Sequence, residues 1–148
     1  MFEVETRIVI AAPMETVWIE LIDLDRWRDW HPYMRFEGGE VKIGSTLKSV
    51  MESDTDTHRL DTTVTRVEPG RVFEWTGEIH EPAYAKGVHG FHLEEASTGT
   101  CLVQTERAEG PFVETETAPM MREHAIKSFE AANAAFKAYV ERRWSSEP

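Results

Sequence analysis

The sequence predicts an α+β fold in which a curved antiparallel sheet of about seven strands is covered by a long C-terminal helix. Residues 23–32 hold two tryptophans on one helical turn before a proline, which marks a helix-to-strand corner. Turn-forming residues recur at short intervals between residues 38 and 99, and an amphipathic stretch of about 25 residues follows. A curved sheet that grips a helix is expected to enclose a cavity for a small, largely apolar molecule.

The bulk composition fits a single domain over residues 1–148. Hydrophobic residues make up 41% of the chain, and no apolar run approaches the roughly 20 residues needed to cross a bilayer. The alternating, acidic start differs from a secretion signal, and Cys101 is the single cysteine, so no internal disulfide is expected. These features predict a cytoplasmic protein without membrane insertion, and they give no indication of its oligomeric state.

The charge balance argues against nucleic acid as a partner. The chain has 16 Lys and Arg residues against 27 Asp and Glu residues, a formal net charge of -11. Such a field repels phosphate backbones and anionic lipid surfaces. Because the acidic residues are scattered, they are interpreted as a solvated surface.

The N-terminal part of the chain alternates and then becomes helical. Residues 2–10 alternate between apolar and polar, which predicts a half-buried strand. Pro13 suits the first turn of a helix whose apolar residues recur every three or four positions. These apolar residues are Val17, Trp18, Leu21 and Ile22. Residues 23–30 predict a second short helix.

Turn-forming residues divide the central part of the chain into short segments, as expected for antiparallel strands. Glu68-Pro69-Gly70 is a strong turn signal, and Ser97-Thr98-Gly99 predicts a hairpin. The strands predicted here are residues 41–43, 46–51, 59–67, 72–79, 87–95 and 100–109.

The last helix is predicted from about residue 117 to Arg143. Its apolar face holds Met121, Ala125, Ser128, Phe129, Ala132, Ala135, Phe136 and Tyr139, and its polar face holds Glu123, Lys127, Glu130, Lys137 and Glu141. The apolar face is small in its first half, so a curved sheet beneath it would leave a cavity. Alternatively, Phe73, Trp75 and Phe91 reach inward from the sheet and fill that volume.

The order of the elements and several short motifs resemble the START-like (SRPBCC) superfamily, and most of all its polyketide cyclase/dehydrase and lipid-transport group. The matching residues are Val17-Trp18, Asp23, Trp27, Trp30, Pro32, Val67-Glu68-Pro69, Phe73-Glu74-Trp75, Phe91, Leu93, Gly99-Thr100, Glu106 and Gly110. The resemblance implies a helix-grip fold with a ligand cavity between the sheet and the last helix. It implies no catalytic residues, because this superfamily shares no catalytic motif.

Strand parity brings a histidine and a glutamate together inside the predicted cavity. A hairpin loop at residues 96–99 pairs Phe91 with Gln104 and His89 with Glu106. The His89–Glu106 pair could act as a general base or hold a polar group of a ligand. Alternatively, the two side chains form a structural hydrogen bond near the open end of the sheet.

Aromatic residues near the corner are candidates for the cavity wall. Trp27 and Trp30 could line the cavity mouth, with Tyr33 supplying a hydroxyl, or one tryptophan could plug the core. Met121 and His124 could contact a ligand from the first turns of the last helix, or His124 could be exposed. The predicted ligand-contacting residues are Trp27, Trp30, Tyr33, Phe73, Trp75, His89, Phe91, Gln104, Glu106, Met121 and His124.

No cofactor or metal site is predicted. His92 lies three positions after His89 on one strand, and this odd offset sends their rings to opposite faces of a sheet. Phosphate-binding glycine loops and nucleophile motifs are also absent as recognisable signals, which disfavours covalent catalysis.

Three hypotheses for function follow from these features. The first is the binding of a small apolar or aromatic ligand, such as a lipid, a sterol or a polyketide-like molecule, which needs only an apolar pocket. The second is an acid-base cyclase or dehydratase for a polyketide-like substrate, with His89, Glu106 and Tyr33 as candidate catalytic residues. The third is an interaction protein, like the co-chaperone relatives, with a filled interior and an exposed apolar patch.

Overall fold

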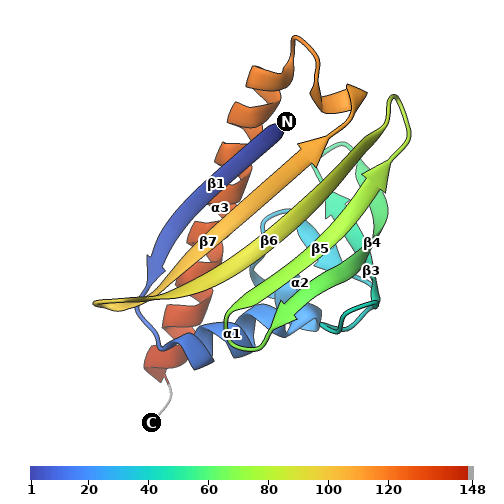
Figure 1. Ribbon diagram of the computed structural model, residues 1–148. Coiled ribbons are helices and arrows are strands. Elements are labelled where there is room, and N and C mark those ends of the chain that lie inside the picture. The colour runs from blue at the N-terminus through green and yellow to red at the C-terminus, as the bar shows by residue number, and fades with distance from the viewer. Residues whose placement is uncertain (147–148) are drawn as a thin grey trace.

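The computed structural model describes residues 1–146 and contains a single curved sheet gripping one long helix (Figure 1). The elements in chain order are β1 (Phe2–Ile10), α1 (Met14–Ile22), the 3-10 turn η1 (Leu24–Arg26), α2 (Trp27–Trp30), β2 (Met34–Phe36), β3 (Thr46–Glu52), β4 (Thr57–Glu68), β5 (Val72–Ile79), β6 (Ala85–Ala96), β7 (Gly99–Glu109), the 3-10 turn η2 (Pro111–Val113) and α3 (Ala118–Ser146). The strands follow the order β1-β7-β6-β5-β4-β3-β2, and every neighbouring pair is antiparallel. This confirms the predicted helix-grip arrangement.

The β6–β7 hairpin has the predicted register. Phe91 lies opposite Gln104, and His89 lies opposite Glu106. The strands continue one pair further than expected, because Ala96 still pairs with Gly99. Gly99 has a φ of 148°, and a Cβ there would lie 2.1 Å from a backbone oxygen of β1, so only glycine fits this corner.

One predicted strand is wrong. Residues 41–43 form part of a loop, and β2 supplies the seventh strand of the sheet instead. Glycines at both ends of the loop, Gly39 and Gly44, adopt positive φ angles of 117° and 90°, which turn the chain away from extended pairing. Strand β2 has only three residues and follows Pro32 closely, so its apolar alternation is too short to recognise.

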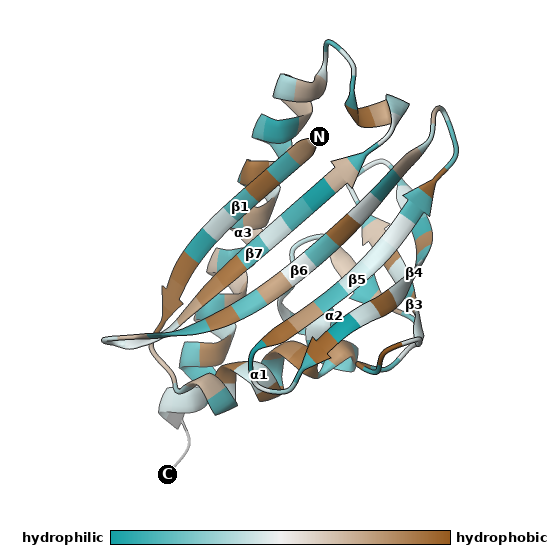
Figure 2. Ribbon diagram, viewed as in Figure 1, coloured by the Kyte–Doolittle hydropathy of each residue, from teal (hydrophilic) through white to brown (hydrophobic). Residues whose placement is uncertain are grey.

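The predicted helices are present with adjusted bounds. In place of one helix over residues 23–30, the 3-10 turn η1 begins at Leu24 and is followed by α2, a single α-helical turn, and α3 extends to Ser146. Figure 1 shows α3 running behind the sheet alongside β1, with α1 near its C-terminal end. The alternation of hydrophilic and hydrophobic residues along β1, β7 and β6 is visible in Figure 2. The apolar side chains on the inner face of these strands pack with Trp27, Phe136 and Val140 to form the core.

Two charged residues of α3, predicted to be solvated, tie the helix to the end of β1. Glu141 accepts hydrogen bonds from the backbone N–H of Ala11 at 2.7 Å and from Lys137 at 2.6 Å. Lys137 also donates to the carbonyl of Val9 at 2.6 Å. The bond from Ala11, followed by the bond from Lys137, holds the pKa of Glu141 below its usual value.

Candidate functional site

A cavity of about 370 Å³ lies between the inner face of the sheet and the first half of α3. That volume falls in the range of small-molecule sites in proteins. Its wall is mostly apolar and includes the aromatic residues Trp27, Trp75, Phe91, Phe112 and Phe129. The small residues Gly77, Gly87 and Ala125 also face it and leave the space open. The aromatic side chains of the sheet therefore line the volume without filling it.

His89 lies at the cavity wall with both ring nitrogens engaged. Its Nδ1 is 2.7 Å from Oε2 of Glu106, and its Nε2 is 2.8 Å from Oε1 of Gln104. The imidazole stacks on Trp75 at 4.9 Å between centroids and meets the ring of Phe129 edge-on at 5.0 Å. These contacts fix the orientation of the ring from both sides.

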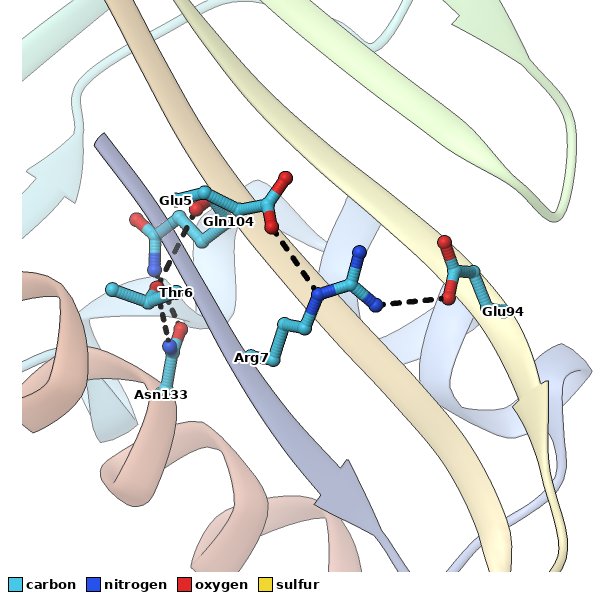
Figure 3. Close-up of polar contacts among 6 residues, drawn as sticks. All are labelled: Glu5, Thr6, Arg7, Glu94, Gln104 and Asn133. Atoms are coloured by element: carbon cyan, nitrogen blue, oxygen red, sulfur yellow. Dashed lines mark hydrogen bonds and ion pairs between the residues drawn. The ribbon is translucent and has the colours of Figure 1, made fainter. Parts of the chain in front are cut away.

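The polar contacts of His89 continue as a buried chain of hydrogen bonds to β1. Gln104 donates from Nε2 to Oδ1 of Asn133 at 2.6 Å, and Asn133 donates from Nδ2 to Oγ1 of Thr6 at 2.9 Å. Thr6 in turn donates to the backbone carbonyl of Gln104 at 3.4 Å. Figure 3 shows Thr6, Gln104 and Asn133 converging, while the next residue of β1, Arg7, turns away toward Glu5 and Glu94.

The direction of this chain determines where a proton is held. A backbone carbonyl can only accept, so the hydroxyl of Thr6 must accept from Asn133, and both amides are oriented in turn. The Oε1 of Gln104 then accepts from Nε2–H of His89. On the other side of the ring, Nδ1 of His89 and Oε2 of Glu106 lie 2.7 Å apart and share a hydrogen bond.

His31, by contrast, is held neutral. Its Nδ1 accepts the backbone N–H groups of Tyr33 and Met34 at 3.3 and 3.1 Å, so its hydrogen is on Nε2. Its ring packs between Trp27, Trp30 and Tyr33. Burial, together with the nearby charge of His89, lowers the pKa of His31 to about 3. His31 lines the cavity, and its ring is uncharged there at neutral pH.

Tyr33 lines the same cavity as a protonated phenol. Burial raises its pKa to about 12, although contact with Ser128 on α3 acts in the opposite direction. The hydroxyl can therefore donate a hydrogen bond at physiological pH, and it does not supply a phenolate.

Eight of the predicted contact residues line the cavity, and three do not. Those that line it are Trp27, Tyr33, Trp75, His89, Phe91, Gln104, Glu106 and Met121. Trp30 instead packs on Phe136 at 4.7 Å, because the single turn of α2 directs it toward the end of α3. Phe73 is fully buried against Trp75 and Phe91, where the core is solid. His124 is exposed, which agrees with the alternative expectation for this residue.

Four polar residues of the site were missed by sequence reasoning: His31, Ser49, Thr62 and Asn133. Asn133 gives the clearest signal, because a buried amide between Phe129 and Phe136 interrupts the apolar face of a helix. Ser49 and Thr62 lie on the inner faces of β3 and β4, where the residues two positions before and after them are apolar. A polar residue on an inner face is an exception to the alternation of polar and apolar residues, so periodicity alone does not predict it.

The two histidines of β6 lie on opposite faces, as their spacing predicts. His92 contacts Glu74 on the outer face, with 3.2 Å between Nε2 and Oε2, whereas His89 faces the cavity. Within residues 1–146, no group of three potential ligands could hold a metal ion. Over the same range, no helix combines the length and apolar character needed to span a membrane.

A curved antiparallel sheet that closes on a long helix over a ligand-sized cavity defines a START-like helix-grip protein. Residues 1–141 match the family described as polyketide cyclase / dehydrase and lipid transport. The chain belongs to this family. No curated protein matches the sequence.

Several solved structures share the fold. Protein CV1439 from Chromobacterium violaceum is 15% identical with a TM-score of 0.78, over 94% of this chain and 96% of that one. The di-domain ARO/CYC StfQ of the steffimycin biosynthetic pathway is 14% identical with a TM-score of 0.74, over 97% of this chain and 51% of its own. Ara h 8.0201 is 15% identical with a TM-score of 0.69, over 93% and 96%. At these identities, the likeness concerns the fold alone.

Proposed function

We propose that the protein binds a small, largely apolar or aromatic molecule, such as a lipid, a sterol or a polyketide-like compound, in the cavity between the sheet and α3. The observation that carries this proposal is the cavity itself, about 370 Å³ in volume and mostly apolar, with a few polar groups at defined positions. In the cytoplasm, where the sequence predicts the chain to reside, such a site would sequester or present its ligand.

The relatives support this choice of ligand class. The family description joins polyketide cyclases and dehydrases with lipid transport, which are activities on largely apolar molecules. StfQ, a di-domain ARO/CYC protein of a biosynthetic pathway, has the same fold. The aromatic rings of Trp75 and Phe129 suit a flat ligand, because they offer faces and edges for stacking.

Native mass spectrometry of freshly purified protein tests the binding proposal. We expect a co-purified small molecule, or a thermal shift with a lipid, sterol or aromatic polyketide. Ala125→Phe, which fills the cavity from α3, should abolish both signals. Ala134→Phe, on the exposed side of the same helix, should retain them. A protein without co-purified ligand and without a shift for any of these classes would overturn the proposal.

A second candidate is an acid-base cyclase or dehydratase for a polyketide-like substrate. The observation that favours it is the hydrogen bond between His89 and Glu106 at the cavity wall, because two such groups can pass a proton to a substrate oxygen and recover it. This chemistry needs neither a metal nor a covalent intermediate. Its test is the turnover of a candidate substrate by Glu106→Gln and His89→Ala. Loss of turnover with retained binding would support an enzyme, and unchanged turnover would exclude this role for the pair.

The third hypothesis, an interaction protein, predicts a filled interior, whereas the structure contains a cavity of about 370 Å³. The large exposed apolar residues of the described chain come from several different elements and loops; they are Met1, Val9, Ile19, Ile43, Tyr84, Met120 and Trp144.

A further inference from the structure

Two hydroxyl groups in the cavity wall have no hydrogen-bond partner within the described protein. Ser49 on β3 is 2% exposed, and Thr62 on β4 is 4% exposed. Both residues line the cavity, and the Oγ of Ser49 and the Oγ1 of Thr62 are buried without a partner. Buried hydroxyls without partners are rare in proteins, because desolvation is not repaid by a hydrogen bond. Two of them on one wall of one cavity therefore call for a ligand atom that satisfies them.

The strand register places the two hydroxyls close enough to serve one atom. Ser49 pairs with Leu60, and Thr62 lies two residues further along β4 on the same face. Diagonal neighbours of this kind have Cα atoms about 7–8 Å apart, so their hydroxyls can converge on one oxygen between them. Gly77 on β5 accommodates the methyl group of Thr62, because a Cβ there would lie 2.9 Å from Cγ2 of Thr62.

The other buried side-chain atoms without partners do not compete for this role. They are Nε1 of Trp30 and the hydroxyl of Tyr139, and neither residue lines the cavity. Of the four buried side-chain atoms without a partner, the two from Ser49 and Thr62 therefore belong to residues that line the cavity.

We propose that Ser49 and Thr62 form a polar subsite that binds a carbonyl or phenolic oxygen of the ligand. The proposal rests on the proposed binding function and narrows its ligand class. A carbonyl oxygen can accept from both hydroxyls, and a phenol can donate to one and accept from the other.

The subsite lies across the sheet from Glu106, whose carboxylate lines the cavity and can accept a hydrogen bond from a second polar group of the ligand. His89 is on β6 and Thr62 is on β4, with β5 between them. Two strand spacings separate β6 from β4, or roughly 10 Å across the sheet. Thr62 packs against Gly77, two residues along β5 from Trp75, the partner of His89. A flat aromatic body with oxygen atoms at opposite ends can span this separation. The two polar positions therefore select a ligand that carries an oxygen atom at each end.

Three probes of increasing polarity test the subsite: naphthalene, 2-naphthol and 2,6-dihydroxynaphthalene. Their affinities are measured by fluorescence titration of the wild-type protein and of Ser49→Ala and Thr62→Val, alone and combined. Thr63→Val is the matched control, because Thr63 neighbours Thr62 on β4 but is exposed on the outer face. The melting midpoints of Ser49→Ala and Thr62→Val should not fall, since neither hydroxyl loses a partner within the protein.

We expect the wild-type protein and the Thr63→Val variant to bind the dihydroxy probe about tenfold more tightly than 2-naphthol, the effect of one additional hydrogen bond. The combined Ser49→Ala and Thr62→Val variant should lose this preference and keep its affinity for naphthalene. A preference that is absent from the wild-type protein, or that survives in the combined variant, overturns the subsite while leaving the cavity as a binding site. Failure of all three probes to bind the wild-type protein counts against both proposals.

Discussion

Replacing His31 with asparagine should reduce the loss of stability that the protein suffers in acid. His31 is held neutral in the folded protein, where its pKa is about 3, whereas a histidine in the unfolded chain has a pKa near 6.5. Below pH 6.5 the unfolded chain takes up a proton that the folded protein does not accept. The contribution of neutral His31 to the free energy of unfolding is therefore fully present above about pH 6.5, and it is lost as the pH falls toward 3.

The size of the effect follows from these two pKa values. A pH of 5 lies about 1.5 units below the pKa of the unfolded side chain, while the side chain in the folded protein remains neutral. At 1.36 kcal/mol per unit, the wild-type protein loses about 2 kcal/mol from this residue between pH 8 and pH 5. Asparagine does not titrate, and its Oδ1 can accept the same backbone N–H groups of Tyr33 and Met34.

Urea denaturation followed by tryptophan fluorescence at pH 8 and pH 5 measures this contribution. The wild-type protein should lose about 2 kcal/mol more than His31→Asn over that interval. The variant will be less stable at both pH values because it lacks the ring, so only the difference in slope is diagnostic. Equal pH dependence in the two proteins would refute the conclusion that burial and the charge of His89 hold His31 neutral.

Three further substitutions test the surroundings of the site. Gly87→Ala should displace Glu106, because the new Cβ would lie 2.6 Å from its Oε1. The ring ¹⁵N chemical shifts of His89 should then change, and unchanged shifts would contradict the hydrogen bond between His89 and Glu106. Asn133→Leu should lower the free energy of unfolding by about 2–3 kcal/mol in urea denaturation, because it strands two buried polar groups, and an unchanged value would refute the hydrogen-bond chain. Glu141→Gln should flatten the dependence of the melting midpoint on pH between about 6 and 3. The pKa of Glu141 is lower in the folded protein than in the unfolded chain, so its carboxylate stabilises the fold above the unfolded pKa, and this stabilisation is lost in acid. An unaltered pH profile would show that the hydrogen bond from Ala11 is unimportant.

Local patterns were sufficient to predict the parts of the fold where strong turns separate regular segments. The turn at Ser97 and Thr98 sets the register of β6 and β7, so the pairing of His89 with Glu106 could be predicted from the spacing of residues alone. The small residues along the first half of α3 likewise indicated a cavity, because Ala125 leaves space where a larger side chain would fill it.

The remaining features depend on packing between distant segments. Periodicity places Phe73 and Trp75 on the same inner face, yet only Trp75 borders the cavity, because the core closes around Phe73. The direction of Trp30 depends on its contact with Phe136, which lies far away in the sequence. The partners of Asn133 lie on the first and the last strand of the sheet, so no local pattern could identify them.

The five tryptophans of the chain report directly on whether a small apolar or aromatic molecule binds in the cavity. Trp27 and Trp75 line the cavity, whereas Trp18, Trp30 and Trp144 do not. In ¹H–¹⁵N NMR spectra recorded during a titration with 2-naphthol, the indole signals of Trp27 and Trp75 should shift and saturate, while the signal of the exposed Trp144 stays in place. Shifts confined to Trp144, or no saturable shift of Trp27 and Trp75, would show that the cavity is not the binding site.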